Sequence, residues 1–352
     1  MVMTRRRFVE SLCLMGGATL VGACGRSDPP TLEEAPWEPA YAKLEAQGLF
    51  VERIEQAYEI MRACTLCPRR CGVNRLKGER GFCRAPANAM AHSHQPHFGE
   101  ETPLVGQHGS GTIFFSNCNL RCVFCQNWPI AHKGLGSQIS EEELAGMMLN
   151  LQRIGCHNIN FVTPTHVMPN ILKATRIALG QGLNVPLCYN TSGYESVEMI
   201  KLLDGIVDIY LPDFKFMDGE QASQYNLAAA QDYPERAKES IAEMHRQVGD
   251  LVTDYRGIAL RGLMVRHLVM PNRVAGTQEF VQWVANNLSK DTYVNIMSQY
   301  RVAHLAYEYE SIARAITTEE YVEAMDWAKE AGLTHLDDRS LSQLDIFRRR
   351  MP

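Results

Sequence analysis

The sequence predicts an α/β fold built on a parallel sheet and preceded by a small cysteine-rich segment. From Thr112 onward, short apolar segments alternate with amphipathic helical segments, which is the pattern of repeated βαβ units. A chain of 352 residues with 45% hydrophobic content can bury one large core with a small appendage. Seven of the eleven cysteines fall into two groups, which favours metal binding over a disulfide framework.

Six strands are expected from the apolar segments. They cover residues 112–116, 158–163, 186–190, 207–212, 264–270 and 294–297. The helices expected between and after them cover residues 142–154, 169–179, 196–204, 277–288 and 318–331, with a longer, mostly helical stretch at 219–250. Residues 44–61 also have helical periodicity. In the first of the intervening helices, Leu144, Met147, Met148 and Leu151 recur at helical spacing, so they are expected in the core.

Three cysteines lie close together directly after the first expected strand, in the segment GSGTIFFSNCNLRCVFCQN at residues 109–127. Cys118, Cys122 and Cys125 cannot all pair as disulfides, and they are one ligand short of a closed zinc site. Three thiolates suit a [4Fe–4S] cluster with one iron left open. The alternatives are a structural zinc loop, or three thiols that are close by chance.

The spacing C-x3-C-x2-C after a strand, with Phe124 before the last cysteine, resembles the radical S-adenosylmethionine (SAM) superfamily. This resemblance implies an incomplete (β/α)6 TIM-like barrel and an open iron that chelates the amino and carboxylate groups of SAM. It further implies reductive cleavage of SAM to a 5′-deoxyadenosyl radical. The stretch Gly99-Glu100-Glu101-x-Pro103 and the following GSGT resemble pyruvate formate-lyase activating enzyme-like proteins.

A second group, Cys64, Cys67, Cys71 and Cys83, precedes the expected barrel with the spacing C-x2-C-x3-C-x11-C. Four thiolates can close a tetrahedral zinc site or hold an auxiliary iron–sulfur cluster, and the sequence does not separate the two. Disulfides are the alternative if the protein is exported. Three histidines follow at positions 92, 94 and 97, a pattern that is more often a surface or packing feature than a metal site.

Polar residues follow the expected strands, where parallel α/β folds bind their ligands. The second strand ends in Thr163-Pro164-Thr165-His166, the third in Asn190-Thr191, and the fourth in Asp213-Phe214-Lys215. The resemblance implies that Thr163, Thr165, His166, Asn190, Thr191, Asp213 and Lys215 contact SAM. The sequence TPTH departs from the GGE-type motif that the family usually has at the second strand end.

The expected function is therefore that of a radical SAM oxidoreductase, and the resemblance points to a protein substrate such as a glycine of a glycyl-radical enzyme. Radical modification of a small molecule, an iron–sulfur electron-transfer protein that does not cleave SAM, and a zinc-only scaffold remain alternatives. A low-potential electron donor is an expected partner. A net charge of −5 gives no basis for a nucleic-acid partner.

The amino terminus predicts export. Thr4-Arg5-Arg6-Arg7-Phe8 resembles a twin-arginine signal, and Val21-Gly22-Ala23-Cys24 resembles a lipoprotein box with Cys24 as the lipidated residue. The expected division is a signal at 1–24, a tether at 25–40, a cysteine-rich segment at 41–108 and a radical SAM barrel at 109–352. The location would be periplasmic or membrane-anchored, or cytoplasmic if the leader is not used. Export conflicts with cytosolic supplies of SAM and reductant.

Overall fold

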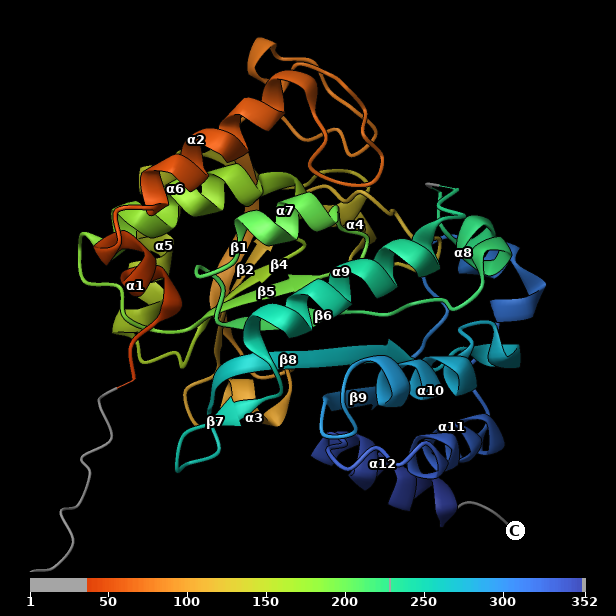
Figure 1. Ribbon diagram of the computed structural model, residues 1–352. Coiled ribbons are helices and arrows are strands. Elements are labelled where there is room, and N and C mark those ends of the chain that lie inside the picture. The colour runs from red at the N-terminus through yellow and green to blue at the C-terminus, as the bar shows by residue number, and fades with distance from the viewer. Residues whose placement is uncertain (1–36, 228, 350–352) are drawn as a thin grey trace, which may run out of the picture. The chain divides into compact units, whose positions relative to one another are not determined.

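The computed structural model describes residues 37–227 and 229–349, which include all seven grouped cysteines. The predicted signal at 1–24 and residues 25–36 of the tether lie outside the described residues. Six parallel strands follow one another across the sheet (Figure 1). They are β2 (Ser110–Phe115), β4 (Ile159–Val162), β5 (Leu187–Thr191), β6 (Ile209–Pro212), β8 (Ala259–Leu268) and β9 (Tyr293–Met297). Each lies at a predicted position, and the ends agree within two residues, except that β8 begins five residues earlier than expected.

The sheet is open, as an incomplete barrel requires. Its strand order is β3-β1-β2-β4-β5-β6-β8-β7, with β9 paired to β8. Among the described residues, no pairing joins β9 back to β1, β2 or β3. The register brings Asn190 beside Val162 on one side and beside Leu211 on the other, so neighbouring strands end close to the same level. The predicted fold class, an incomplete (β/α)6 barrel, is confirmed.

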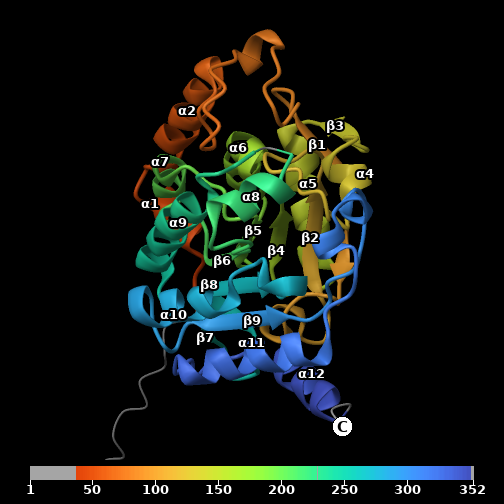
Figure 2. The same ribbon diagram turned by 90° about the vertical axis from the view of Figure 1, so that its right-hand side faces the viewer.

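Helices lie along the outside of this sheet (Figures 1 and 2). They are α5 (Glu141–Arg153), α6 (Met168–Leu179), α7 (Val197–Leu202), α9 (Tyr233–Val248), α10 (Thr277–Asn287) and α11 (Thr318–Glu330). Two of them begin with a capping box, formed by Ser140 with Glu143 and by Thr317 with Glu320. These side chains satisfy backbone N–H groups that a helix start leaves without partners, which fixes where the helix begins. Leu144, Met148 and Leu151 are fully buried, as expected for core positions.

The sequence did not predict three strands that run antiparallel to their neighbours. Strand β1 (Ala89–His97) pairs with β2 and with β3 (Ser137–Ile139), and β7 (Val252–Thr253) pairs with β8. The sequence of β1, AMAHSHQPH, lacks the apolar alternation of a half-buried strand, because its second half is only partly covered. Strand β1 therefore extends the sheet with residues from the cysteine-rich segment.

The helical predictions need three corrections. Residues 44–61 form two helices, α1 (Ala40–Ala46) and α2 (Phe50–Ile60), because Gly48 adopts a left-handed conformation at φ 74° between them. The stretch 219–250 also divides, into α8 (Gly219–Tyr225) and α9. A last helix, α12 (Asp338–Arg348), was not expected; Asp337 caps its start. In the part of the chain that the structure describes, no helix has the length and apolar character needed to cross a membrane.

Candidate functional site

The three-cysteine loop begins where β2 ends and is held from both sides by backbone contacts. Asn117 and Arg121, the residues directly before Cys118 and Cys122, have left-handed backbone conformations at φ 78° and 54°. The Leu120 N–H lies 3.4 Å from the Cys118 sulfur, and the Asn127 N–H donates to the Cys125 sulfur. The Val123 N–H donates to the Tyr225 carbonyl at the end of α8. These contacts fix the loop although it has no regular secondary structure at its centre.

The three thiols line one cavity together with the carboxyl ends of the parallel strands. Its volume is about 280 Å³. Besides Cys118, Cys122 and Cys125, its wall includes the following side chains from strand ends: Val162, Thr163, Asn190, Thr191, Ser192, Asp213, Lys215, Arg266, Leu268, Met297 and Gln299. All three cysteines are free. The cavity therefore combines three soft metal ligands with polar and charged groups from five strands.

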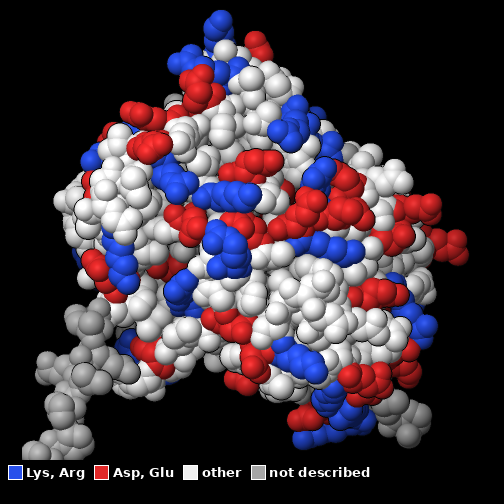
Figure 3. Space-filling model, viewed as in Figure 1, with Lys and Arg blue, Asp and Glu red and all other residues white. Residues whose placement is uncertain are grey.

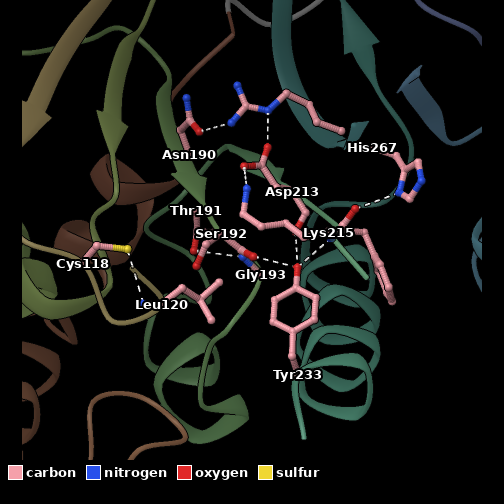
Figure 4. Close-up of polar contacts among 12 residues, drawn as sticks. Cys118, Leu120, Asn190, Thr191, Ser192, Gly193, Asp213, Lys215, Tyr233 and His267 are labelled. Atoms are coloured by element: carbon pink, nitrogen blue, oxygen red, sulfur yellow. Dashed lines mark hydrogen bonds and ion pairs between the residues drawn. The ribbon is translucent and has the colours of Figure 1, made fainter. Parts of the chain in front are cut away.

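A network of charges centres on Asp213, which follows β6. One carboxylate oxygen of Asp213 accepts a bond from Arg266 Nε at 2.7 Å, and the other accepts from Lys215 Nζ at 2.6 Å (Figure 4). Arg266 also donates to Asn190 Oδ1 at 2.5 Å and lies 3.4 Å from a carboxylate oxygen of Glu100. The side chains of Asp213, Lys215 and Arg266 are less than one-fifth exposed. Two cations thus surround one carboxylate at the wall of the cavity.

Charge pairing sets the protonation of this network. Burial alone would raise the pKa of Asp213, but the charges of Arg266 and Lys215 outweigh it and hold the pKa below its ordinary value. Burial lowers the pKa of Lys215, and the nearby Asp213 carboxylate more than compensates, so Lys215 stays protonated. Tyr233 from α9 holds the backbone beside this network. Its hydroxyl accepts a hydrogen bond from the Lys215 N–H and lies 2.9 Å from the Ser192 carbonyl oxygen (Figure 4).

Of the predicted SAM contacts, Thr163, Asn190, Thr191, Asp213 and Lys215 line the cavity, whereas Thr165 and His166 do not. After Thr163, at φ 59°, the chain turns into a short 3-10 helix (Thr165–Val167). This turn points the Thr165 hydroxyl at the Glu195 carboxylate, 2.5 Å away, and the His166 imidazole at the Ser116 carbonyl, 2.7 Å away. The structure therefore does not bring these two predicted contacts to the cavity.

Three residues of the site were absent from the predicted contacts. Arg266 shares a strand with His267, but His267 lies outside the cavity and bonds the Phe214 carbonyl and Thr277. Glu100 reaches the network from before β2. Glu195 is fully buried and accepts bonds from Thr165 and Thr191. Its burial raises its pKa to about 7. The sequence signal that could have identified Arg266 is a charged residue near the carboxyl end of an otherwise apolar strand.

The second cysteine group surrounds a much smaller cavity of about 20 Å³. Cys64, Cys67, Cys71 and Cys83 line it, together with Asn119 from the three-cysteine loop and His166. All four are free cysteines. Basic side chains stand over this segment (Figure 3), and residues 62–84 contain seven Arg and Lys but only one carboxylate, Glu79. Among the three histidines of β1, His97 bonds Glu100 at 2.9 Å.

The donor chemistry at the 280 Å³ cavity fits an iron–sulfur cluster, and the charged and polar strand ends beside the thiols suit the polar groups of SAM. Within residues 37–227 and 229–349, no three His, Cys, Asp or Glu side chains already stand in metal-binding geometry. Cysteine thiols turn about a single bond, and burial raises the pKa of Cys125 to about 12. A bound cation reverses that shift, because a coordinating thiol is deprotonated.

The comparisons with known proteins agree with this site. A family model for the radical SAM superfamily matches residues 112–257. A protein of Methanocaldococcus jannaschii, "Uncharacterized protein MJ0674", is 34% identical over 296 residues, which are 81% of this chain and 80% of that protein. A second protein of that organism, "Uncharacterized protein MJ0808", is 27% identical over 40% of this chain and 46% of its own length.

Two solved structures are also similar. "Native anSMEcpe with bound AdoMet" has a TM-score of 0.42 at 9% identity, and this chain spans 61% of its length, with 62% of this chain covered. Methylornithine synthase (PylB) has a TM-score of 0.35 at 13% identity, over 62% of this chain and 67% of its own. The family match, which begins within β2 and includes the three-cysteine loop, implies a [4Fe–4S] cluster and SAM as cofactors. The chain belongs to the radical SAM superfamily.

Proposed function

We propose that this protein cleaves SAM reductively and uses the resulting radical to abstract hydrogen from a protein substrate. The observation that carries the proposal is the shared wall of the 280 Å³ cavity, where three free thiols face the Asp213, Lys215 and Arg266 network. Cys118, Cys122 and Cys125 would hold the cluster. When bound, the cluster supplies one electron to SAM, which yields methionine and the 5′-deoxyadenosyl radical.

The protein's own residues then bind and orient SAM. Lys215 and Arg266 provide cations for its carboxylate, and Asp213 keeps both cations in place. Asn190 and Thr191 provide hydrogen-bonding groups for hydroxyl or amino groups of SAM. Apolar side chains on the same wall, including Leu120, Phe124 and Val162, exclude water from the reacting atoms.

The direct test is anaerobic. The reconstituted protein, given SAM and a low-potential reductant, is expected to release 5′-deoxyadenosine and methionine in equal amounts, and to release neither without the reductant. An iron–sulfur electron-transfer protein would accept the electron without consuming SAM, so reduction of the cluster with no SAM cleavage would reject the proposal.

A protein substrate is the finer part of the proposal, and it rests on the resemblance to glycyl-radical activating enzymes. Electron paramagnetic resonance after incubation with a candidate partner protein and SAM is expected to show a glycine-centred radical on that partner. SAM cleavage that is stimulated only by a small molecule, with label transfer from that molecule into 5′-deoxyadenosine, would favour small-molecule modification instead.

We also propose that Cys64, Cys67, Cys71 and Cys83 bind a second metal, and that the protein is exported. The four free thiols on one cavity support the first proposal. The twin-arginine and lipoprotein-like motifs support the second. Replacing Arg5 and Arg6 by Lys is expected to retain the protein in the cytosol, and replacing Cys24 is expected to block lipidation. Full-length unaltered protein found in the cytosol by fractionation would reject export.

A further inference from the structure

The free space between the four cysteines is far smaller than the free space at the three-cysteine loop. A cavity needs about 10–15 Å³ to hold a single water molecule. The four-cysteine cavity measures about 20 Å³, whereas the cavity at the three-cysteine loop measures about 280 Å³. A [4Fe–4S] cluster inserts four irons and four sulfides between its thiolates. Such a cluster would have to push the four-cysteine segment apart, whereas a single metal ion would need only the thiols to turn about their Cα–Cβ bonds.

The four sulfur atoms lie within one another's electrostatic field. The Cys67 thiol interacts electrostatically with Cys64 and Cys83, and the Cys83 thiol interacts with Cys64 and Cys71. The backbone also holds the arms of the site together, because the Cys64 N–H donates to the Val73 carbonyl at 2.9 Å and the Gly72 N–H donates to the Cys64 carbonyl at 3.0 Å. The four thiols thus line one cavity and lie close enough to interact, although they do not already stand in metal-binding geometry.

Backbone N–H groups point at two of the sulfurs, from the second residue after each cysteine. The Arg69 N–H donates to the Cys67 sulfur, and the Ala85 N–H donates to the Cys83 sulfur. Such bonds stabilise thiolate charge, and they orient the ligand as outer-shell partners do in metal sites. Arg84, directly after Cys83, has the left-handed conformation (φ 62°) that this tight turn requires.

We propose that Cys64, Cys67, Cys71 and Cys83 bind one Zn²⁺ ion in tetrahedral geometry. Four thiolates complete the coordination of zinc, with Zn–S distances of about 2.3 Å, and leave no position for SAM. The inference rests on the proposed second metal site, and it does not depend on SAM cleavage. It selects a single ion over the auxiliary iron–sulfur cluster that the spacing alone also allows.

The zinc site would fix the three-cysteine loop. Arg69, two residues after Cys67, donates through Nε to the Asn119 carbonyl at 3.2 Å, and Asn119 directly follows Cys118. On the other side, the buried Arg75 donates to the His166 carbonyl at 2.7 Å, while the His166 imidazole bonds the Ser116 carbonyl. Both ends of the loop segment from Ser116 to Asn119 are therefore tied to the four-cysteine segment.

The test is metal analysis of the full chain purified without oxygen, combined with zinc X-ray absorption. The unaltered protein is expected to carry one zinc with four sulfur neighbours at about 2.3 Å, besides about four irons. A variant with Cys118, Cys122 and Cys125 all replaced by Ala is expected to lose its iron and keep its zinc. This variant should have no visible absorbance and take up no electron on reductive titration, because zinc has no redox chemistry.

Iron or an iron–sulfur absorbance retained by that triple variant would overturn the zinc assignment, as would unaltered protein with about eight irons and no zinc. Absence of SAM cleavage by unaltered protein that contains zinc would count against the proposed activity alone. A milder variant tests the cavity size. In Gly81→Ala the new Cβ would meet the Cys71 sulfur at 2.8 Å, so zinc affinity is expected to fall. Gly146→Ala, where nothing lies within 4 Å, is the matched control and should keep zinc unchanged.

Discussion

The two cysteine regions of this protein differ in the number of their thiols and in the size of the cavity that these thiols line. The three-cysteine loop stands at the edge of a cavity of about 280 Å³ whose other walls are strand ends, and it leaves coordination incomplete. The four-cysteine segment encloses about 20 Å³ and supplies four thiols, which would complete the coordination of one zinc ion. Ligand number and free volume therefore vary inversely. We call the three cysteines at the larger cavity the open set and the four cysteines at the smaller cavity the closed set.

The two regions also share a backbone feature. Asn117, Arg121, Arg70 and Arg84 each stand next to a grouped cysteine and each have a positive φ. Left-handed conformations are costly for residues other than glycine, and they persist where the surrounding structure or a ligand requires them. Backbone N–H groups also donate to sulfur in both regions, from Asn127 to Cys125 and from Arg69 to Cys67, so the two regions differ mainly in their surroundings.

The largest expected effect is on the open set. Cys122→Ala removes one of three ligands, and we expect loss of the cluster's iron and absorbance together with loss of detectable 5′-deoxyadenosine formation. Cys156→Ala is the matched control, because Cys156 is a buried free cysteine outside both groups. Continued 5′-deoxyadenosine formation by Cys122→Ala would remove the distinction between the two regions.

A substitution in the closed set is expected to lower the stability of the protein more than its SAM-cleaving activity. Cys67→Ala is expected to lower the stability by about 3 kcal/mol, or roughly 4 °C in melting temperature, because metal binding at such a site contributes directly to folding. Part of the SAM cleavage should remain. Thermal unfolding and 5′-deoxyadenosine assays on the same preparation measure both. A folded variant that keeps its SAM-binding cluster but makes no 5′-deoxyadenosine would show that the four-cysteine site is catalytic.

Within the open region, Asp213→Asn tests the charge network. The change leaves Arg266 and Lys215 without their common partner, so SAM affinity is expected to fall about tenfold and stability by about 3 kcal/mol. The cluster absorbance should remain, because Asp213 is not a ligand. Asp326→Asn, which breaks an exposed pair with Arg348, is the control and should change neither. Unchanged SAM affinity and turnover in Asp213→Asn would exclude Asp213 from the site.

A smaller effect separates two buried carboxylates. Glu195 has a pKa raised to about 7, because it is buried with hydroxyl partners and no cation, whereas the pKa of Asp213 is lowered. Between pH 4.5 and 7 the folded protein holds a proton on Glu195 that the unfolded chain releases, so this group makes stability fall as pH rises. The difference between the folded and unfolded pKa values, 7 − 4.5, corresponds to a loss of about 3 kcal/mol of stability. This loss is complete once the pH is above 7.

Glu195→Gln should therefore flatten the decline in melting temperature between pH 5 and pH 8. Asp208, whose pKa burial also raises to about 7, contributes a decline of the same sign in both proteins and serves as the internal reference. Asp213 acts in the opposite sense, since its contribution to stability is present above about pH 3.9 and disappears as pH falls through its lowered pKa. Parallel melting curves for the variant and the unaltered protein would contradict the Glu195 assignment.

The positions of the six parallel strands along the chain, most of the helices between them and the two cysteine groups could all be predicted from the sequence. These features depend on local patterns: apolar periodicity, caps such as Ser140 and Thr317, and cysteines close together in the chain. The positions of Asn190, Thr191 and Asp213 at the cavity followed too, because the ends of parallel strands meet at one edge of the sheet.

Which polar groups contact one another depends on the fold and could not be predicted from the sequence. Arg266 reaches Asp213 from a strand 53 residues later in the chain, and Glu100 approaches the same guanidinium from 166 residues earlier. The 3-10 turn after Thr163 sends Thr165 and His166 away from the cavity, although both follow a strand end. Strand β1 was missed because its polar residues carry no alternation. The physical reason is common to these cases: a buried polar side chain takes its partner from whatever the fold brings within hydrogen-bond distance, and sequence spacing does not record that distance.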